Sequence, residues 1–148
     1  MKQDELVGVV EKLLDTCKDA EKGYKNAAEH VKQEHLKNLF LELSLQRGSF
    51  VKELESELSN LGQPPKQDSG SVAGSARIAW MDLKANVGGG DGAVLASVEH
   101  GEDIAKKVYV EALSNSLPQE LDAVVRRQAE SIMNAHETVK SMRDGLAA

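Results

Sequence analysis

The segment SVEHGEDIAKKVY, residues 97–109, gathers side chains that can bind a metal ion or move protons. Glu99, His100, Glu102 and Asp103 lie within five consecutive positions of an expected helix. Carboxylates and imidazole are common ligands for iron and zinc in proteins. Residues share a helix face only when they are three or four positions apart, so these four side chains cannot all point the same way. The phase of the helix therefore decides which of them can take part in a buried site.

The apolar spacing puts one of these acids on the inward side of the helix. Glu102 falls in the core row itself, and Glu99 falls at the border of that row. His100 and Asp103 are expected on the surface. The row repeats at intervals of three and four residues, as the buried stripe of a bundle helix does. Its members are Val94, Val98, Glu102, Ala105, Tyr109 and Ala112.

Polar residues also enter or flank the core rows of the other long helices. Arg47 and Gln128 occupy core positions, while Glu21 and His136 flank theirs. An unpaired buried charge costs several kcal/mol, so these groups must bind one another, water or a metal. A guanidinium has five donors and engages a carboxylate in a bidentate pair. We therefore predict a buried polar cluster formed by Glu21, Arg47, Glu102 and Gln128.

Four long amphipathic helices must position these residues. Their apolar rows predict helices at about 4–31, 34–62, 91–115 and 117–146. Gly62, followed by two prolines, ends the second of them firmly. The turn after residue 31 is marked only by a phase break with no Gly or Pro, so one continuous helix over 4–62 remains an alternative.

The connections between these helices predict the topology of the bundle. Short turns join the first helix to the second and the third to the fourth. The segment between the second and third helices is long enough to travel the length of a bundle, and a shorter helix is expected in it at 71–87. The sequence thus predicts one all-α domain over residues 1–148, an up-down four-helix bundle with one long crossover, which is the topology of ferritin-like bundles.

Composition limits the partners and the compartment. The chain carries 24 acidic and 18 basic residues, a net charge of -6, and the basic residues are dispersed. Such a surface repels phosphate backbones and anionic lipid, so we expect no nucleic-acid or membrane partner. Cys17, the only cysteine, lies on an apolar row and is expected to be a small buried hydrophobe. Neither a signal peptide nor a membrane span is evident, which favours the cytoplasm.

Four stretches of the chain carry a resemblance to a known family. They are LLDTCKDAEKGYKNAAE, LFLELSLQRGSF, GSVAGSARIAWMDLK and GEDIAKKVY. The chain resembles an uncharacterised bacterial family of ferritin-like four-helix-bundle proteins over nearly its whole length. The resemblance implies the bundle fold, and it implies no established activity.

The ferritin-like comparison also supplies a metal hypothesis. Di-metal bundles use one Glu from each of two helices and a Glu-x-x-His from each of the other two. Carried over to this chain, the pattern offers Glu21, Glu99, Glu102 and His136 as ligands. The pattern is incomplete, because Met133 stands where the Glu three residues before His136 should be and the second helix has no Glu-x-x-His.

Two functional hypotheses follow from these observations. The favoured one is a non-enzymatic ferritin-like bundle that needs no cofactor, in which an Arg-carboxylate cluster fills a degenerate metal site. Such a protein would act through its surface, and self-association is expected. The alternative is an iron-binding oxidase or storage protein with an incomplete site. A helical adaptor with a dedicated partner is a third hypothesis, but no residue pattern in the sequence supports it.

Overall fold

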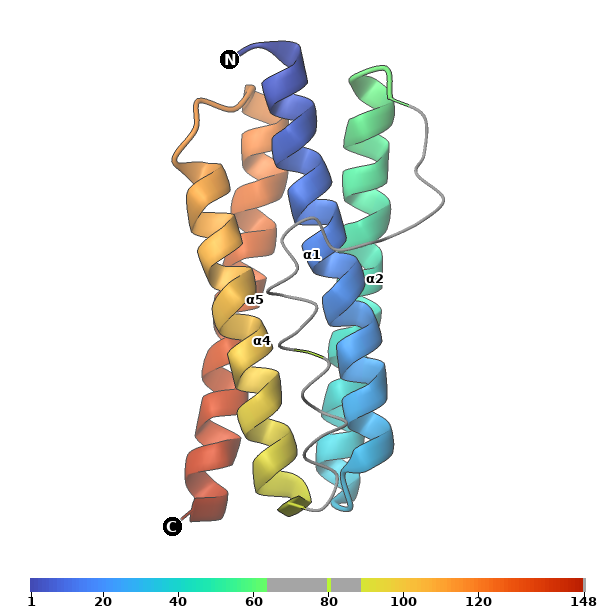
Figure 1. The fold of residues 1–148 in the computed structure, drawn as a ribbon, viewed down its shortest axis with the longest axis vertical. Coiled ribbons are helices and arrows are strands. Elements are labelled where there is room, and N and C mark those ends of the chain that lie inside the picture. The colour runs from blue at the N-terminus through green and yellow to red at the C-terminus, as the bar shows by residue number, and fades with distance from the viewer. Residues whose placement is uncertain (64–79, 81–88, 148) are drawn as a thin grey trace.

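A computed structural model of the protein describes residues 1–63, 80 and 89–147. The described residues form four long helices and no β-strand (Figure 1). The helices are α1 (Gln3–His30), α2 (Glu34–Asn60), α4 (Gly90–Leu113) and α5 (Gln119–Ala147). The predicted all-α four-helix bundle is thereby confirmed. The shorter helix expected at 71–87 lies outside the described residues, apart from Trp80.

The helix ends differ slightly from those that the sequence predicts. The first helix ends at His30, so the continuous helix over 4–62 is wrong. Residues 31–33 form a tight turn in which Val31 is buried and the backbone N–H groups of Lys32 and Gln33 donate to the Asp91 carboxylate at 2.8 and 3.0 Å. The turn is thus fixed by a contact from another helix, which explains why it needs no Gly or Pro.

The end of α2 follows the predicted chemistry. Gly62 adopts a φ of 81°, a conformation that residues with a Cβ rarely take. This geometry lets the N–H of Gln63 donate to the carbonyl of Leu58 at 3.0 Å. The helix itself stops at Asn60 and not at residue 62, and α5 begins at Gln119, two residues later than expected.

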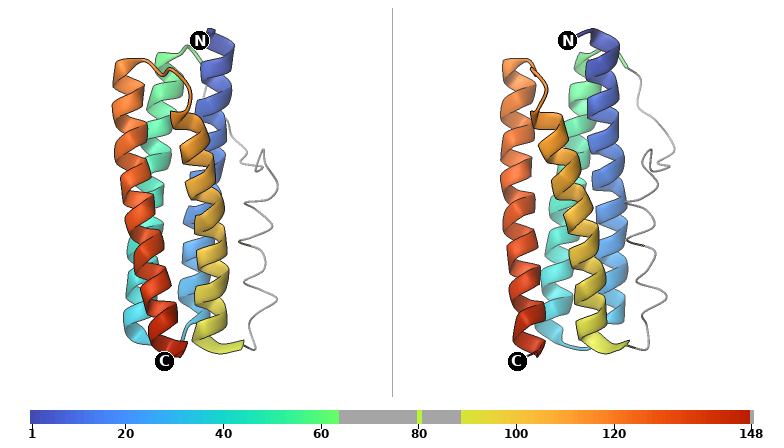
Figure 2. Two further views of the ribbon diagram at one scale, coloured as in Figure 1. Left: turned by 90° about the vertical axis from the view of Figure 1, so that its left-hand side faces the viewer. Right: turned by 60° about the vertical axis from the view of Figure 1, so that its left-hand side comes forward.

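The four helices form a square arrangement in which each pair of neighbours is antiparallel. α1 packs against α2 and α4, and α5 packs against α4 and α2. Figures 1 and 2 show that α2 and α4 run in the same direction on one diagonal of the bundle, so α2 ends and α4 begins at opposite ends of the bundle. A crossover connection between them is therefore required.

The interior divides into two hydrophobic cores stacked along the bundle axis. We call the half that contains the start of α1 the upper core, and the half that contains the end of α1 the lower core. Both cores are built mainly from Leu, Val and Ala. The aromatic residues of the upper core are Phe50 and Tyr109, and those of the lower core are Tyr24, Phe40 and Trp80. Arg47 and Glu102 follow one core on their helices and precede the other, so the polar cluster lies between the two cores.

Candidate functional site

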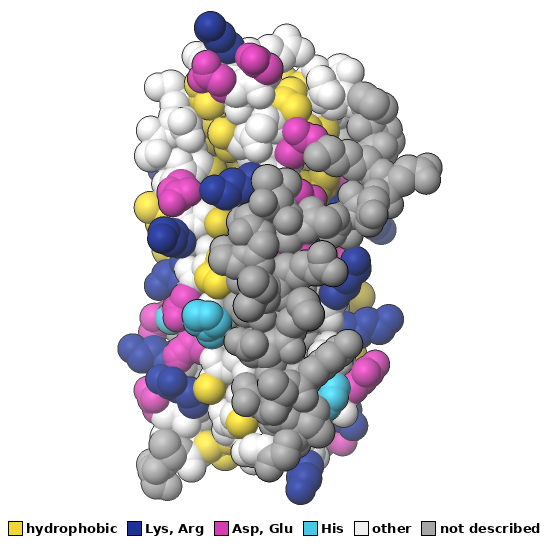
Figure 3. All heavy atoms as spheres, viewed as in Figure 1, with side chains coloured by type: hydrophobic (Ala, Val, Ile, Leu, Met, Phe, Trp, Pro, Cys, Tyr) yellow, Lys and Arg dark blue, Asp and Glu magenta, His cyan; other side chains and the backbone are white. Residues whose placement is uncertain are grey.

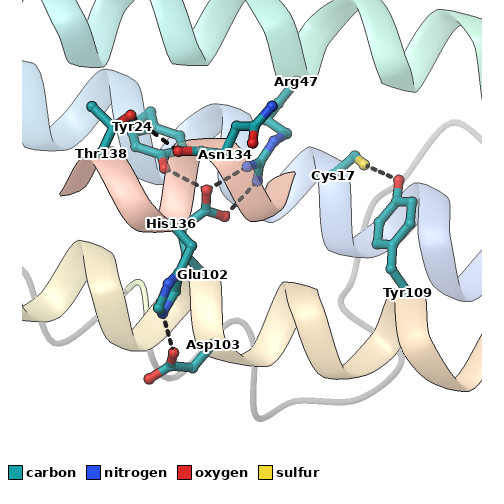
Figure 4. Close-up of polar contacts among 9 residues, drawn as sticks. All are labelled: Cys17, Tyr24, Arg47, Glu102, Asp103, Tyr109, Asn134, His136 and Thr138. Atoms are coloured by element: carbon teal, nitrogen blue, oxygen red, sulfur yellow. Dashed lines mark hydrogen bonds and ion pairs between the residues drawn. The ribbon is translucent and has the colours of Figure 1, made fainter. Parts of the chain in front are cut away.

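The centre of the bundle is occupied by an ion pair between α2 and α4. Arg47 and Glu102 are both 0% exposed. Arg47 Nη1 donates to Glu102 Oε1 at 2.7 Å, and Arg47 Nη2 donates to Glu102 Oε2 (Figure 4). The contact is the bidentate geometry that a guanidinium and a carboxylate prefer. Because α2 and α4 lie on a diagonal, this one pair ties together helices that do not otherwise pack as neighbours.

Tyr24 of α1 completes this pair. Its hydroxyl donates to Glu102 Oε2 at 2.7 Å, and its ring lies 5.5 Å from the Arg47 guanidinium carbon. The Tyr24 ring thus makes a cation–π contact with Arg47, and the Tyr24 hydroxyl makes a charge-assisted hydrogen bond to Glu102. We call Tyr24, Arg47 and Glu102 the charged layer.

Electrostatics keep Arg47 and Tyr24 each in one protonation state. Burial is the largest single influence on Arg47 and opposes its charge, but the Glu102 carboxylate and the other neighbouring groups together raise the pKa of Arg47 above its ordinary value. Burial and then the Glu102 charge raise the pKa of Tyr24 well above 10.0. The arginine therefore stays charged and the tyrosine stays a neutral donor across the physiological range.

Trp80 packs against Tyr24 and lies between α1 and α4. The indole ring centroid lies 5.1 Å from that of Tyr24, and the side chain is 5% exposed. Two glycines make room for it: a Cβ at Gly101 would lie 2.5 Å from Trp80 Cε2, and a Cβ at Gly23 would clash with the same ring. The slot between α1 and α4 thus depends on glycine at both positions.

A second polar layer lies within the upper core, separate from the charged layer. Tyr109 donates to Gln128 Oε1 at 2.8 Å, and the Gln128 amide donates to Glu53 Oε1 at 3.0 Å. The Tyr109 hydrogen is used in this bond, so the Cys17 thiol is the donor in its 3.0 Å contact with the Tyr109 oxygen. Burial raises the pKa of Cys17 to about 11. We call Cys17, Tyr109 and Gln128 the neutral layer.

The structure brings together only part of the predicted buried cluster. Arg47 and Glu102 are paired, whereas Gln128 bonds within the neutral layer and not to Arg47. Glu21 is half-buried at the α1–α2 surface, where its carboxylate lies over Gly48; a Cβ on that glycine would be 2.5 Å from Glu21 Oε2. Arg47 pairs with Glu102 instead, and the Glu21 carboxylate lies against Gly48 of α2.

The hypothetical metal ligands are separated into different ion pairs. Glu102 forms an ion pair with Arg47, and Oε1 of the buried Glu99 lies 3.2 Å from Nη2 of Arg143. His136, which is 7% exposed, contacts Asp103 Oδ1 at 2.5 Å through its Nε2. Among residues 1–63, 80 and 89–147, no three His, Cys, Asp or Glu side chains come together as a metal site would require. The donor set does not fit a di-metal centre.

Several of these contacts have no simple signal in the sequence. Both tyrosines stand on core rows, where a buried hydroxyl needs a hydrogen-bond partner, and that requirement could have pointed to their bonds. The pairing of His136 with Asp103 depends on the register between α4 and α5. Nothing in the local sequence marks Gly23 and Gly101 as the walls of an aromatic slot.

The described surface carries charges of both signs (Figure 3). Basic and acidic side chains are interspersed on the described part of the face in Figure 3. None of the helices in the described ranges is long and apolar enough to cross a membrane.

These features define a four-helix bundle whose centre holds a buried arginine–glutamate pair. Residues 5–115 match the family described as Domain of unknown function (DUF2383), and the chain belongs to this family. The matched region contains the whole charged layer, whereas Gln128 and His136 of α5 lie beyond it. No curated protein matches the chain.

Proposed function

We propose that the protein is a ferritin-like bundle without catalytic metal, in which the charged layer takes the central position that di-metal relatives give to their ions. The observation that carries this proposal is the bidentate contact of Arg47 with Glu102 in a fully buried setting. On this proposal the interior serves to specify the fold, and the protein acts through its outer surface in the cytoplasm of a bacterial cell.

The chemistry of the charged layer supports this assignment. Both Glu102 oxygens accept hydrogen bonds from Arg47, and Oε2 also accepts one from Tyr24. A divalent ion would have to displace these donors and would be repelled by the guanidinium, whose charge is permanent. Freeing Glu102 for a metal would also leave Arg47 buried without a counterion, at a cost of about 3–5 kcal/mol.

The other reactive groups of the described interior also favour a structural role. The Cys17 thiol is 0% exposed and its pKa is raised to about 11, so little thiolate exists at neutral pH. Burial raises the pKa of Tyr109 well above 10.0 as well. Neither group is suited to act as a nucleophile or a base near pH 7.

Metal titration tests the proposal. Anaerobic Fe(II) titration and metal analysis of the purified protein are expected to show no stoichiometric binding and no iron oxidation above the rate in buffer. Stoichiometric binding that is lost in both Glu102→Gln and His136→Ala would overturn the proposal in favour of the iron-binding alternative. Glu130→Gln, which removes an exposed carboxylate of α5, is the matched control for nonspecific binding.

A further inference from the structure

The outward face of α2 carries two leucines that the bundle does not use. Leu45 is 77% exposed and Leu41 is 43% exposed, one helical turn apart. Single exposed apolar residues are common on protein surfaces, but adjacent ones beside a groove are typical of an interaction site.

A groove of about 480 Å³ runs beside these leucines between α1 and α2. Its floor includes Ser44, whose hydroxyl donates to the Glu21 carbonyl at 2.8 Å. The groove is mainly apolar and is large enough to receive a leucine side chain. The residues that line it are Glu21, Lys22, Lys25, Leu41, Ser44 and Leu45.

The two leucines lie at the middle of a regular stripe along α2. The stripe repeats at intervals of four and three residues, the spacing of a helix face that packs against another helix. Its first member is acidic, its last member is basic, and both are exposed. In order, its members are Glu34, Asn38, Leu41, Leu45, Gly48 and Lys52.

We propose that this stripe binds a second copy of the chain, with the two α2 helices antiparallel across a twofold axis near residue 43. In that arrangement Leu41 packs against Leu45 of the second copy, and the reciprocal contact repeats it. Glu34 then lies opposite Lys52 of the second copy at each end of the interface. Asn38 then lies opposite Gly48 of the second copy, beside the Glu21 carboxylate that lies over that glycine.

Charge complementarity selects this occupant and this orientation. A parallel pairing would place Glu34 against Glu34 and Lys52 against Lys52, which like-charge repulsion opposes. Lys25 of α1 also lines the groove, where its long side chain can cover apolar surface. This interface does not depend on whether the interior binds metal.

Light scattering after size exclusion, measured over a range of concentrations, tests the interface. The protein is expected to have the mass of a dimer, and Leu45→Glu is expected to be a monomer with unchanged helical circular dichroism. Val110→Glu is the matched control, because Val110 is 54% exposed on α4 and lies outside the stripe. A monomeric mass for the unaltered protein, or a dimer that persists in Leu45→Glu, overturns the proposal.

A charge exchange tests the antiparallel register. Glu34→Lys and Lys52→Glu are each expected to weaken the dimer about tenfold, because each creates two like-charge contacts. The double variant Glu34→Lys with Lys52→Glu restores both pairs and is expected to dimerise nearly as well as the unaltered protein. A double variant that is weaker than both single variants overturns this register. Monomers that bind an acidic amphipathic peptide through Leu45 would instead assign the stripe to another protein.

Discussion

The charged layer and the neutral layer bury the same kind of side chain in two different ways. Tyr24 and Tyr109 are both 0% exposed, and each hydroxyl donates to an oxygen on another helix. Tyr24 donates to one member of an ion pair, whereas Tyr109 donates to an uncharged amide. A hydrogen bond to a charged group contributes about 1.5–3 kcal/mol and a neutral one about 1 kcal/mol. The two layers therefore differ in what their disruption costs.

The comparison also shows where the bundle gains specificity. The charged layer joins α2 to α4 across the diagonal and involves α1, so it can form only in one arrangement of these three helices. The neutral layer joins α1, α4 and α5 through bonds between uncharged groups, and its bond to a carboxylate reaches the part-buried Glu53 of α2. Since a buried ion pair gains little net stability over an apolar replacement, we expect the charged layer to select the topology more than to stabilise it.

The largest effect is expected from breaking the ion pair on one side. Arg47→Met should lower the free energy of unfolding by about 3–5 kcal/mol at neutral pH, because it leaves the Glu102 carboxylate buried without a counterion. Part of the loss should return on acidification, as protonation removes the unpaired charge. Urea unfolding followed by circular dichroism measures both effects.

The matched control for this prediction replaces both partners. Arg47→Met combined with Glu102→Leu should be close to the unaltered protein in stability, because no unpaired charge is left behind. An Arg47→Met variant as stable as the unaltered protein would show that the pair is not the electrostatic unit described above.

An intermediate effect is expected from removing one hydroxyl at a time. Tyr24→Phe should cost about 2 kcal/mol, and Tyr109→Phe should cost about 1 kcal/mol. The ring stays in place in both variants, so the difference between them mainly reports the charge of the acceptor. Tyr109→Phe also removes the acceptor of the weak Cys17 thiol bond. Equal losses in thermal or urea unfolding would remove the distinction between the two layers.

The smallest effect at neutral pH is expected at Cys17. Cys17→Ala should cost at most about 1 kcal/mol, because the thiol fills little volume and makes a weak hydrogen bond. At alkaline pH the thiol matters more: burial raises its pKa from 9.0 to about 11, so the unfolded chain releases this proton first. Stability should therefore fall between about pH 9 and 11, and it should fall less in Cys17→Ala.

The control for the alkaline experiment is thiol reactivity. Alkylation of Cys17 in the folded protein at pH 8 should be slow and should speed up on adding urea, since the thiol is fully buried. Rapid alkylation of the folded protein would contradict the assigned burial. Folding also raises the pKa of Tyr24 and Tyr109. Some loss of stability at alkaline pH is therefore expected in the unaltered protein and in Cys17→Ala alike.

The sequence by itself predicts the four helices and the inward direction of Arg47, Glu102 and Gln128. Both depend on local periodicity: 3.6 residues per turn fixes which side chains share a face, and the core row then shows which face is buried. The separate turn at residues 31–33 was harder to predict, because the Asp91 contact that fixes it comes from a distant part of the chain.

Only the tertiary structure decided which inward groups meet. Glu21 and Arg47 are one turn apart in a simple antiparallel estimate, yet the Glu21 carboxylate lies over Gly48 and the guanidinium binds Glu102. Periodicity defines direction around a helix and leaves the height of one helix against another undetermined. That height depends on turn geometry and on packing such as that of Trp80 against two glycines, and it determines which polar groups become partners.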